Sequence, residues 1–191
     1  MKFLLIAVDG LDVERIMAWP KLENFRLLLE YGCYGRLPTH MPPMAPAGLC
    51  LAAGQDPGYL GLYTEASHTL PADPLLWELI TAQGGTAVLL GLPPAWRRPN
   101  FTGHWQTQAA ADPFTACRQQ FATARHWLET VTWDYFHLYD DGLSRLSRQL
   151  GPEDATVMAY YQALDAEIGS LLPLLDEETA VLLLSTHSII P

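Results

Sequence analysis

The fold is decided by two apolar stretches near the ends of the chain, FLLIAVDG at residues 3–10 and VLLLSTHS at residues 181–188. Each is a short run of aliphatic residues that ends in polar ones, Asp9 in the first and Thr186 and His187 in the second. Such runs are typical of strands that are buried on both faces of a parallel sheet. Because ligands of open α/β sheets bind beyond the carboxyl ends of the strands, we expect Asp9 and His187 to lie close together at that edge.

Between these stretches, apolar runs alternate with helical patterns, which indicates an α/β protein with a mostly parallel sheet and helices on both faces. We expect one domain over residues 1–191. The pattern predicts strands at 3–8, 86–91, 135–139 and 181–184, and helices at 21–31, 47–53, 75–83, 113–130 and 155–172. Residues 91–112 are rich in Pro, Trp and Gly and predict an irregular segment.

Composition narrows the classes of function. The 191 residues are 49% hydrophobic and 17% charged, which fits a globular protein with a sizeable core. A net charge of −10 argues against a nucleic-acid partner, because phosphate backbones are bound by clustered Lys and Arg. Three widely spaced cysteines, with no CxxC pair, do not indicate a zinc finger. We expect a cytoplasmic protein with free thiols, no signal peptide and no membrane span.

Residues 42–63 read PPMAPAGLCLAAGQDPGYLGLY, with paired prolines, small residues, a glycine and a Pro-Gly step. Together with Asp9 and His187, this segment resembles the nucleophile and metal-binding segments of the alkaline phosphatase superfamily, in its type I phosphodiesterase/nucleotide pyrophosphatase branch. The resemblance implies an alkaline phosphatase-like α/β fold and a Ser or Thr that attacks phosphorus while metal ions hold it. Here the nucleophile position reads Ala45, and a His of the same loop reads Leu60. A methyl group cannot attack phosphorus, so no catalytic residue is assigned.

The resemblance also implies metal ligands at five positions. Asp9 and His187 keep ligand residue types, whereas Ser144, Arg148 and Thr186 stand where the family has Asp, His and Asp. Structural zinc usually takes four protein ligands and catalytic zinc three, so two ligands and a hydroxyl predict poor affinity. A cation at position 148 further disfavours a divalent ion. We therefore expect no tightly bound metal and at most one weakly bound zinc.

The retained ligand residue types and two nearby aspartates also have purely structural interpretations. Asp9 could cap a turn, and His187 could be a hydrogen-bonded histidine at a strand end. Asp140 and Asp141 could form a displaced metal site, but an exposed turn before Gly142 is the favoured interpretation.

The family chain continues past the point that corresponds to the end of this sequence and supplies a further His ligand. We accordingly expect this chain to lack the family's C-terminal portion.

Three hypotheses of function follow. The first, which we favour, is a catalytically degenerate member of the family that acts not as an enzyme but by binding a protein partner or a small ligand in the former active-site cleft. The second is a metal-dependent phosphodiesterase or phosphatase with a rearranged site, in which a metal-bound water attacks. The third is a scaffold that self-associates as a homodimer and so covers exposed sheet or core surface. The sequence does not identify ligand-binding residues for any of them.

Overall fold

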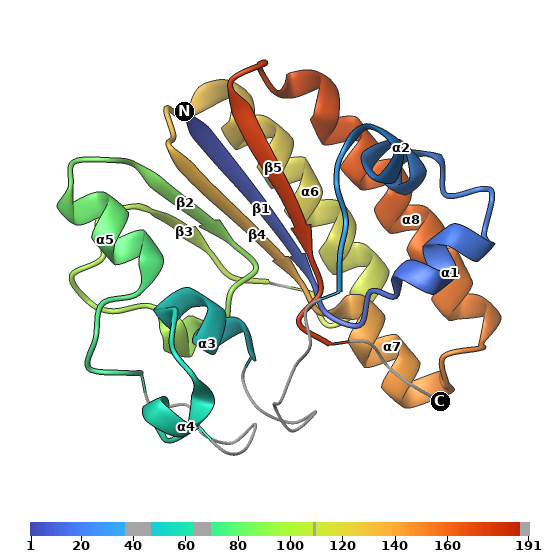
Figure 1. Cartoon of the computed structure of the whole chain (residues 1–191), viewed down its shortest axis with the longest axis horizontal. Coiled ribbons are helices and arrows are strands. Elements are labelled where there is room, and N and C mark those ends of the chain that lie inside the picture. The colour runs from blue at the N-terminus through green and yellow to red at the C-terminus, as the bar shows by residue number, and fades with distance from the viewer. Residues whose placement is uncertain (37–46, 63–69, 109, 188–191) are drawn as a thin grey trace.

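The computed structural model describes residues 1–36, 47–62, 70–108 and 110–187. Five strands in these ranges form one parallel sheet in the order β3-β2-β4-β1-β5 (Figure 1). Their bounds are β1 Lys2–Val8, β2 Ala87–Leu90, β3 His104–Gln106, β4 Tyr135–Asp140 and β5 Thr179–Leu184. The predicted α/β fold with a parallel sheet is therefore confirmed. β3 falls in the segment that was expected to be irregular, because its three residues at the sheet edge carry no apolar run.

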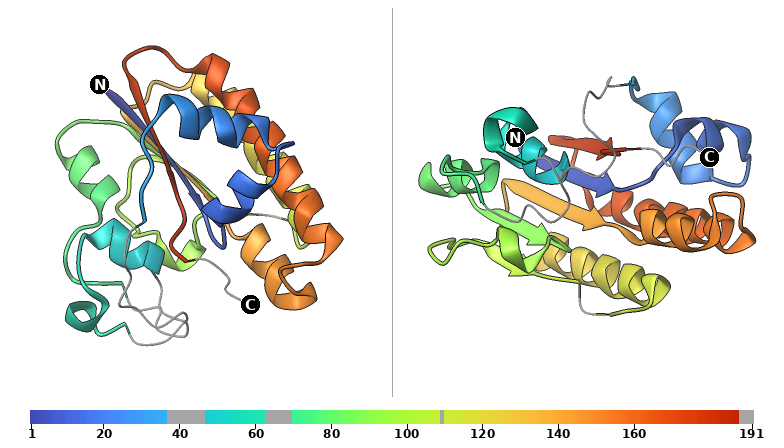
Figure 2. Two further views of the ribbon diagram at one scale, coloured as in Figure 1. Left: turned by 45° about the vertical axis from the view of Figure 1, so that its right-hand side comes forward. Right: turned by 90° about the horizontal axis from the view of Figure 1, so that it is seen from below.

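Helices pack on both faces of the sheet (Figure 2). One face is covered by a layer whose buried side chains form the larger core, namely α1 Val13–Ala18, α2 Glu23–Tyr31, α6 Pro113–Thr130, α7 Gly142–Leu150 and α8 Ala155–Leu171. The other face carries a smaller layer, namely α3 Ala47–Ala53, α4 Pro57–Leu60 and α5 Leu76–Ala82, with the 3-10 turn η1 Pro94–Trp96. A second 3-10 turn, η2 Leu172–Leu174, follows α8. The segments that became α1, α4 and α7 were not predicted as helices.

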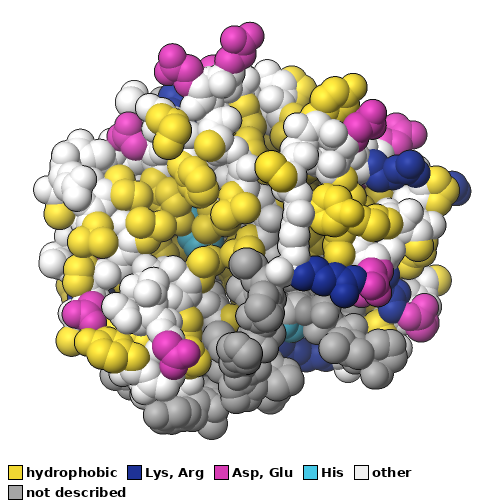
Figure 3. Space-filling view, in the orientation of Figure 1, with side chains coloured by type: hydrophobic (Ala, Val, Ile, Leu, Met, Phe, Trp, Pro, Cys, Tyr) yellow, Lys and Arg dark blue, Asp and Glu magenta, His cyan; other side chains and the backbone are white. Residues whose placement is uncertain are grey.

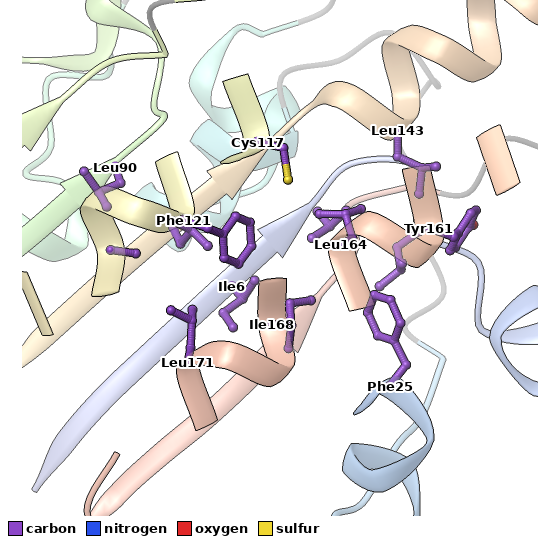
Figure 4. Close-up of a cluster of buried hydrophobic side chains, with 14 of the residues drawn as sticks. Ile6, Phe25, Leu90, Cys117, Phe121, Leu143, Tyr161, Leu164, Ile168 and Leu171 are labelled. Carbon is purple, nitrogen blue, oxygen red and sulfur yellow. The ribbon is translucent and has the colours of Figure 1, made fainter. Parts of the chain in front are cut away.

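The alternation of side chains along β1 divides the core in two. Ile6 joins the larger cluster, where Figure 4 shows it beneath Phe121 of α6 and Leu164 of α8. Leu5 joins the smaller cluster with Trp77 of α5. Successive residues of a strand point to opposite faces, so an uninterrupted apolar strand is what a sheet covered on both sides requires. No helix among the described residues is long and apolar enough to cross a membrane.

Candidate functional site

The candidate site lies where the carboxyl ends of β1, β4 and β5 meet. These strands are parallel neighbours, with Val8 opposite Asp140 on β4. The backbone N–H of Asp9 donates to the carbonyl of Asp140 at 2.9 Å, and the N–H of Gly10 donates to the carbonyl of His187 at 3.1 Å. The structure thus brings the Asp9 and His187 segments together, as their positions after buried strands led us to expect.

A continuous set of hydrogen bonds joins the side chains at this edge. The Tyr139 hydroxyl donates to one carboxylate oxygen of Asp9 at 2.5 Å, and the Thr186 hydroxyl donates to the other. The Thr186 hydroxyl oxygen is 3.1 Å from Nδ1 of His187, and the Ser144 hydroxyl oxygen is 3.3 Å from Nε2. We call these five residues the Asp9 network. Within it, both oxygens of Asp9 and both ring nitrogens of His187 have a partner.

The donor set of the Asp9 network does not fit the two-metal centre that the family resemblance implies. It offers one carboxylate and one imidazole, and the remaining groups are hydroxyls, whereas zinc sites use three or four His, Cys, Asp or Glu ligands. Among the described residues, no three side chains of those types are placed to hold a metal ion. The atoms of Asp9 and His187 that would bind a metal are engaged with neighbouring side chains.

Arg148, at the remaining former ligand position, differs from Ser144 in its exposure. Ser144 and Arg148 are one turn apart on α7, but Ser144 is buried and Arg148 is exposed. Ala45, the expected nucleophile position, lies outside the described residues. Leu60 ends α4 and packs against the smaller core, so an apolar residue there contributes packing.

The expectation of an exposed turn is wrong for Asp140. This residue ends β4 and is fully buried, because β4 runs through it and α7 begins only two residues later. Its carboxylate accepts the Tyr160 hydroxyl of α8 at 2.9 Å and the Gly142 N–H at 3.1 Å. Burial raises the pKa of Asp140 to about 7, and the charges of Asp141 and Asp9 add to the effect. Asp140 is thus a structural carboxylate beneath α8.

Asp141 is half-buried and directly precedes α7. Its carboxylate lies 3.4 Å from the guanidinium of Arg145 one turn later. Burial raises the pKa of Asp141, the Arg145 charge lowers it, and the Asp9 carboxylate raises it again. Neither Asp140 nor Asp141 belongs to a three-ligand group among the described residues. The displaced metal site therefore finds no support in their geometry.

The sequence did not lead us to predict that two tyrosines of this region donate hydrogen bonds to the aspartates. Tyr139 holds Asp9, and burial together with that carboxylate raises the pKa of Tyr139 far above its ordinary value, so the hydroxyl stays protonated as a donor. Tyr160 holds Asp140 in the same way. Tyr139 precedes the last residue of a strand that was itself predicted, and this position is the signal that could have placed it at the edge.

Comparison with known proteins adds a family and a fold. Residues 72–191 match the sequence profile of the type I phosphodiesterase / nucleotide pyrophosphatase family. Among solved structures, murine ectonucleotide pyrophosphatase / phosphodiesterase 5 superposes with a TM-score of 0.69 at 13% identity, over 98% of this chain and 57% of that one. An inactive Thr-to-Ala variant of the murine protein in complex with AMP gives 0.69 at 14% identity, with the same coverage. No curated protein matches the chain.

A second kind of enzyme shares the fold. Phosphonoacetate hydrolase from Sinorhizobium meliloti 1021, in complex with phosphonoformate, superposes with a TM-score of 0.72 at 12% identity, over 98% of this chain and 56% of that one. The chain spans somewhat more than half the length of these structural relatives. At such identities the likeness establishes the fold alone.

Proposed function

Because this chain belongs to the type I phosphodiesterase/nucleotide pyrophosphatase family of the alkaline phosphatase superfamily, we propose that it is a degenerate member that has lost two-metal phosphoryl transfer and acts by binding. The observation that carries the proposal is the Asp9 network. Four of its five residues stand where the family resemblance implies metal ligands, and they hydrogen-bond to one another. Half-buried polar groups that satisfy each other in this way do not require a metal ion.

The missing nucleophile supports the same conclusion independently. Ala45 has no oxygen that could attack phosphorus. Phosphoryl transfer depends chiefly on positioning and on stabilising charge in the transition state, and metal ions supply much of that stabilisation. Loss of the nucleophile and of the metal ligands removes both contributions. The protein would then act by holding a small ligand or a protein partner at the carboxyl edge.

The charge at this edge favours a neutral or cationic ligand. The carboxylates of Asp9 and Asp141 raise the pKa of Asp140, the carboxylate of Asp9 also raises that of Asp141, and the chain carries a net charge of −10. A phosphate group entering without a metal ion would be repelled. The murine Thr-to-Ala variant binds AMP, so AMP is the natural probe. We expect AMP to bind this chain far more weakly than a neutral nucleoside such as adenosine does, or not at all.

Hydrolysis and metal content test the loss of catalysis. We would dialyse the protein, add back zinc, manganese or magnesium, and follow turnover of nitrophenyl phosphate and bis-nitrophenyl phosphate. The expected rate equals that of the double variant Asp9→Ala, His187→Ala, which serves as the control for contaminants. Elemental analysis of the dialysed protein should find no stoichiometric pair of zinc ions. Turnover that is robust in the parent protein and vanishes in the double variant would refute the proposal.

One observation favours a hydrolase with a rearranged site as the second candidate. The carboxylates of Asp9, Asp140 and Asp141 are mutually unfavourable, and a divalent cation would relieve that repulsion. Calorimetric titration with zinc distinguishes the two candidates. Micromolar or tighter binding, lost on Asp9→Ala and accompanied by metal-dependent AMP binding, would favour the hydrolase.

A further inference from the structure

Among the residues that the structure describes, the smaller helix layer leaves part of its sheet face uncovered. α3 and α5 pack over the β2 side, whereas over β1 and β5 the same face presents apolar side chains at the surface (Figures 1 and 3). Leu182 of β5 is 42% exposed and Leu76 of α5 is 40% exposed. Parallel sheets are normally covered on both faces, and a contiguous exposed apolar area marks an interaction site.

The uncovered area contains a groove of about 390 Å³ near the amino ends of β1 and β4. Its walls are almost entirely apolar. The residues that line it are Met1, Phe3, Leu76, Ile80, Asp134 and Tyr135, and we call it the amino-edge groove. Phe3 pairs with Tyr135 across the strands, and their rings stack with centroids 6.2 Å apart. Leu182 lies on the same face because Leu5, two residues after Phe3, is its partner on β1.

Acidic residues border this groove. Asp134 directly precedes β4, and the exposed residues Asp176, Glu177 and Glu178 directly precede β5. The strand register sets both segments beside the first residues of β1, where Lys2 pairs with Asp176 at 2.8 Å. Figure 3 shows acidic side chains along the upper border of the hydrophobic area. The groove therefore combines apolar walls with a rim on which carboxylates outnumber the lysine.

We propose that the amino-edge groove binds a basic amphipathic helix of a protein partner, with the apolar stripe of the helix in the groove and its Lys and Arg side chains against the acidic rim. Helices that dock in this way present apolar residues at i, i+3, i+4 and i+7. A second copy of the chain is a poorer occupant, because a symmetric contact would bring two acidic rims together and like charges across an interface are costly.

This surface is separate from the Asp9 network. β1 runs from the groove to Asp9, and its seven residues span about 20 Å. Peptide binding at the groove can therefore be tested separately from the function proposed for the carboxyl edge. Either site can be disrupted while the other is left intact.

The probe is a synthetic amphipathic helical peptide of Leu and Lys, compared with a peptide of the same composition whose sequence has no apolar face. Fluorescence anisotropy of the labelled peptides gives both affinities at physiological ionic strength. We expect the amphipathic peptide to bind at least about tenfold more tightly, and Leu76→Glu to remove that preference. The matched control is Leu150→Glu, since Leu150 is also helical and is 44% exposed, but lies on α7. It should leave binding unchanged.

Charge reversal in the acidic rim gives a second test. Glu177 and Glu178 are exposed residues outside the helices and strands, so we expect the fold to tolerate their replacement. Glu177→Lys with Glu178→Lys should weaken the amphipathic peptide about tenfold, whereas Glu23→Lys with Glu30→Lys on α2 should not. If both double variants lost peptide affinity equally, the peptide would be responding only to net charge, and the proposal would be overturned. So would equal binding of the two peptides. Sedimentation velocity that finds a dimer in the parent protein and a monomer in Leu76→Glu would assign the groove to a second copy instead.

Discussion

Replacing Asp140 by Asn should change how the stability of this protein depends on pH. Asp140 is fully buried at the end of β4, and desolvation raises its pKa from the ordinary 3.8 to about 7. The Tyr160 hydroxyl and the Gly142 N–H oppose this shift, and the Asp141 and Asp9 charges add to it. Asn keeps an oxygen that can accept both hydrogen bonds, but it cannot ionise.

The sign follows from proton binding. Between about pH 4 and pH 7 the folded protein holds a proton on Asp140 that the unfolded chain has released, so stability falls as the pH rises. This contribution is fully present below the unfolded pKa of 3.8 and is lost as the pH rises through about 7. A shift of about three units, at about 1.4 kcal/mol per unit, corresponds to a loss on the order of 4 kcal/mol. The Asn variant lacks this loss.

Urea unfolding of both proteins across this pH range measures the effect. We expect the unfolding free energy of Asp140→Asn, minus that of the parent, to increase with pH by an amount on the order of 4 kcal/mol. Asp134→Asn is the control, since Asp134 is exposed and also accepts a backbone N–H, that of Thr86 at 2.8 Å. A difference between Asp140→Asn and the parent that stays constant with pH would refute the reasoning.

Three further outcomes are expected. Gly142→Ala should lower the unfolding free energy by about 1–3 kcal/mol in urea, because an added Cβ would lie 2.0 Å from the buried hydroxyl of Tyr160; an unchanged midpoint would contradict the close packing. Thr186→Val should cost about 1–3 kcal/mol in thermal unfolding, since it removes the hydroxyl that donates to Asp9, whereas Thr186→Ser should cost less. Ala45→Thr alone should not restore hydrolysis of bis-nitrophenyl phosphate, because the metal ligands are still missing; turnover would show that metal binding had survived.

The sequence by itself determined the class of fold and the edge at which the candidate site lies. The strands of residues 2–8 and 179–184 and the helix of residues 113–130 were predicted closely, because each carries its signal locally as an apolar run or a helical repeat. The rule that parallel strands present their carboxyl ends at one edge then brought Asp9 and His187 together. The family resemblance identified the substituted positions residue by residue, and the family itself is confirmed.

Only the tertiary structure decided how those positions are satisfied. The Thr186 hydroxyl reaches Asp9 across 177 residues of sequence, and the Ser144 hydroxyl reaches His187 across 43. The burial of Asp140 depends on Tyr160 of α8, which packs over the end of β4. The amino-edge groove exists because α5 covers one part of a sheet face and not another. Hydrogen bonds and burial of this kind depend on distances through space, and no local pattern of residues records them.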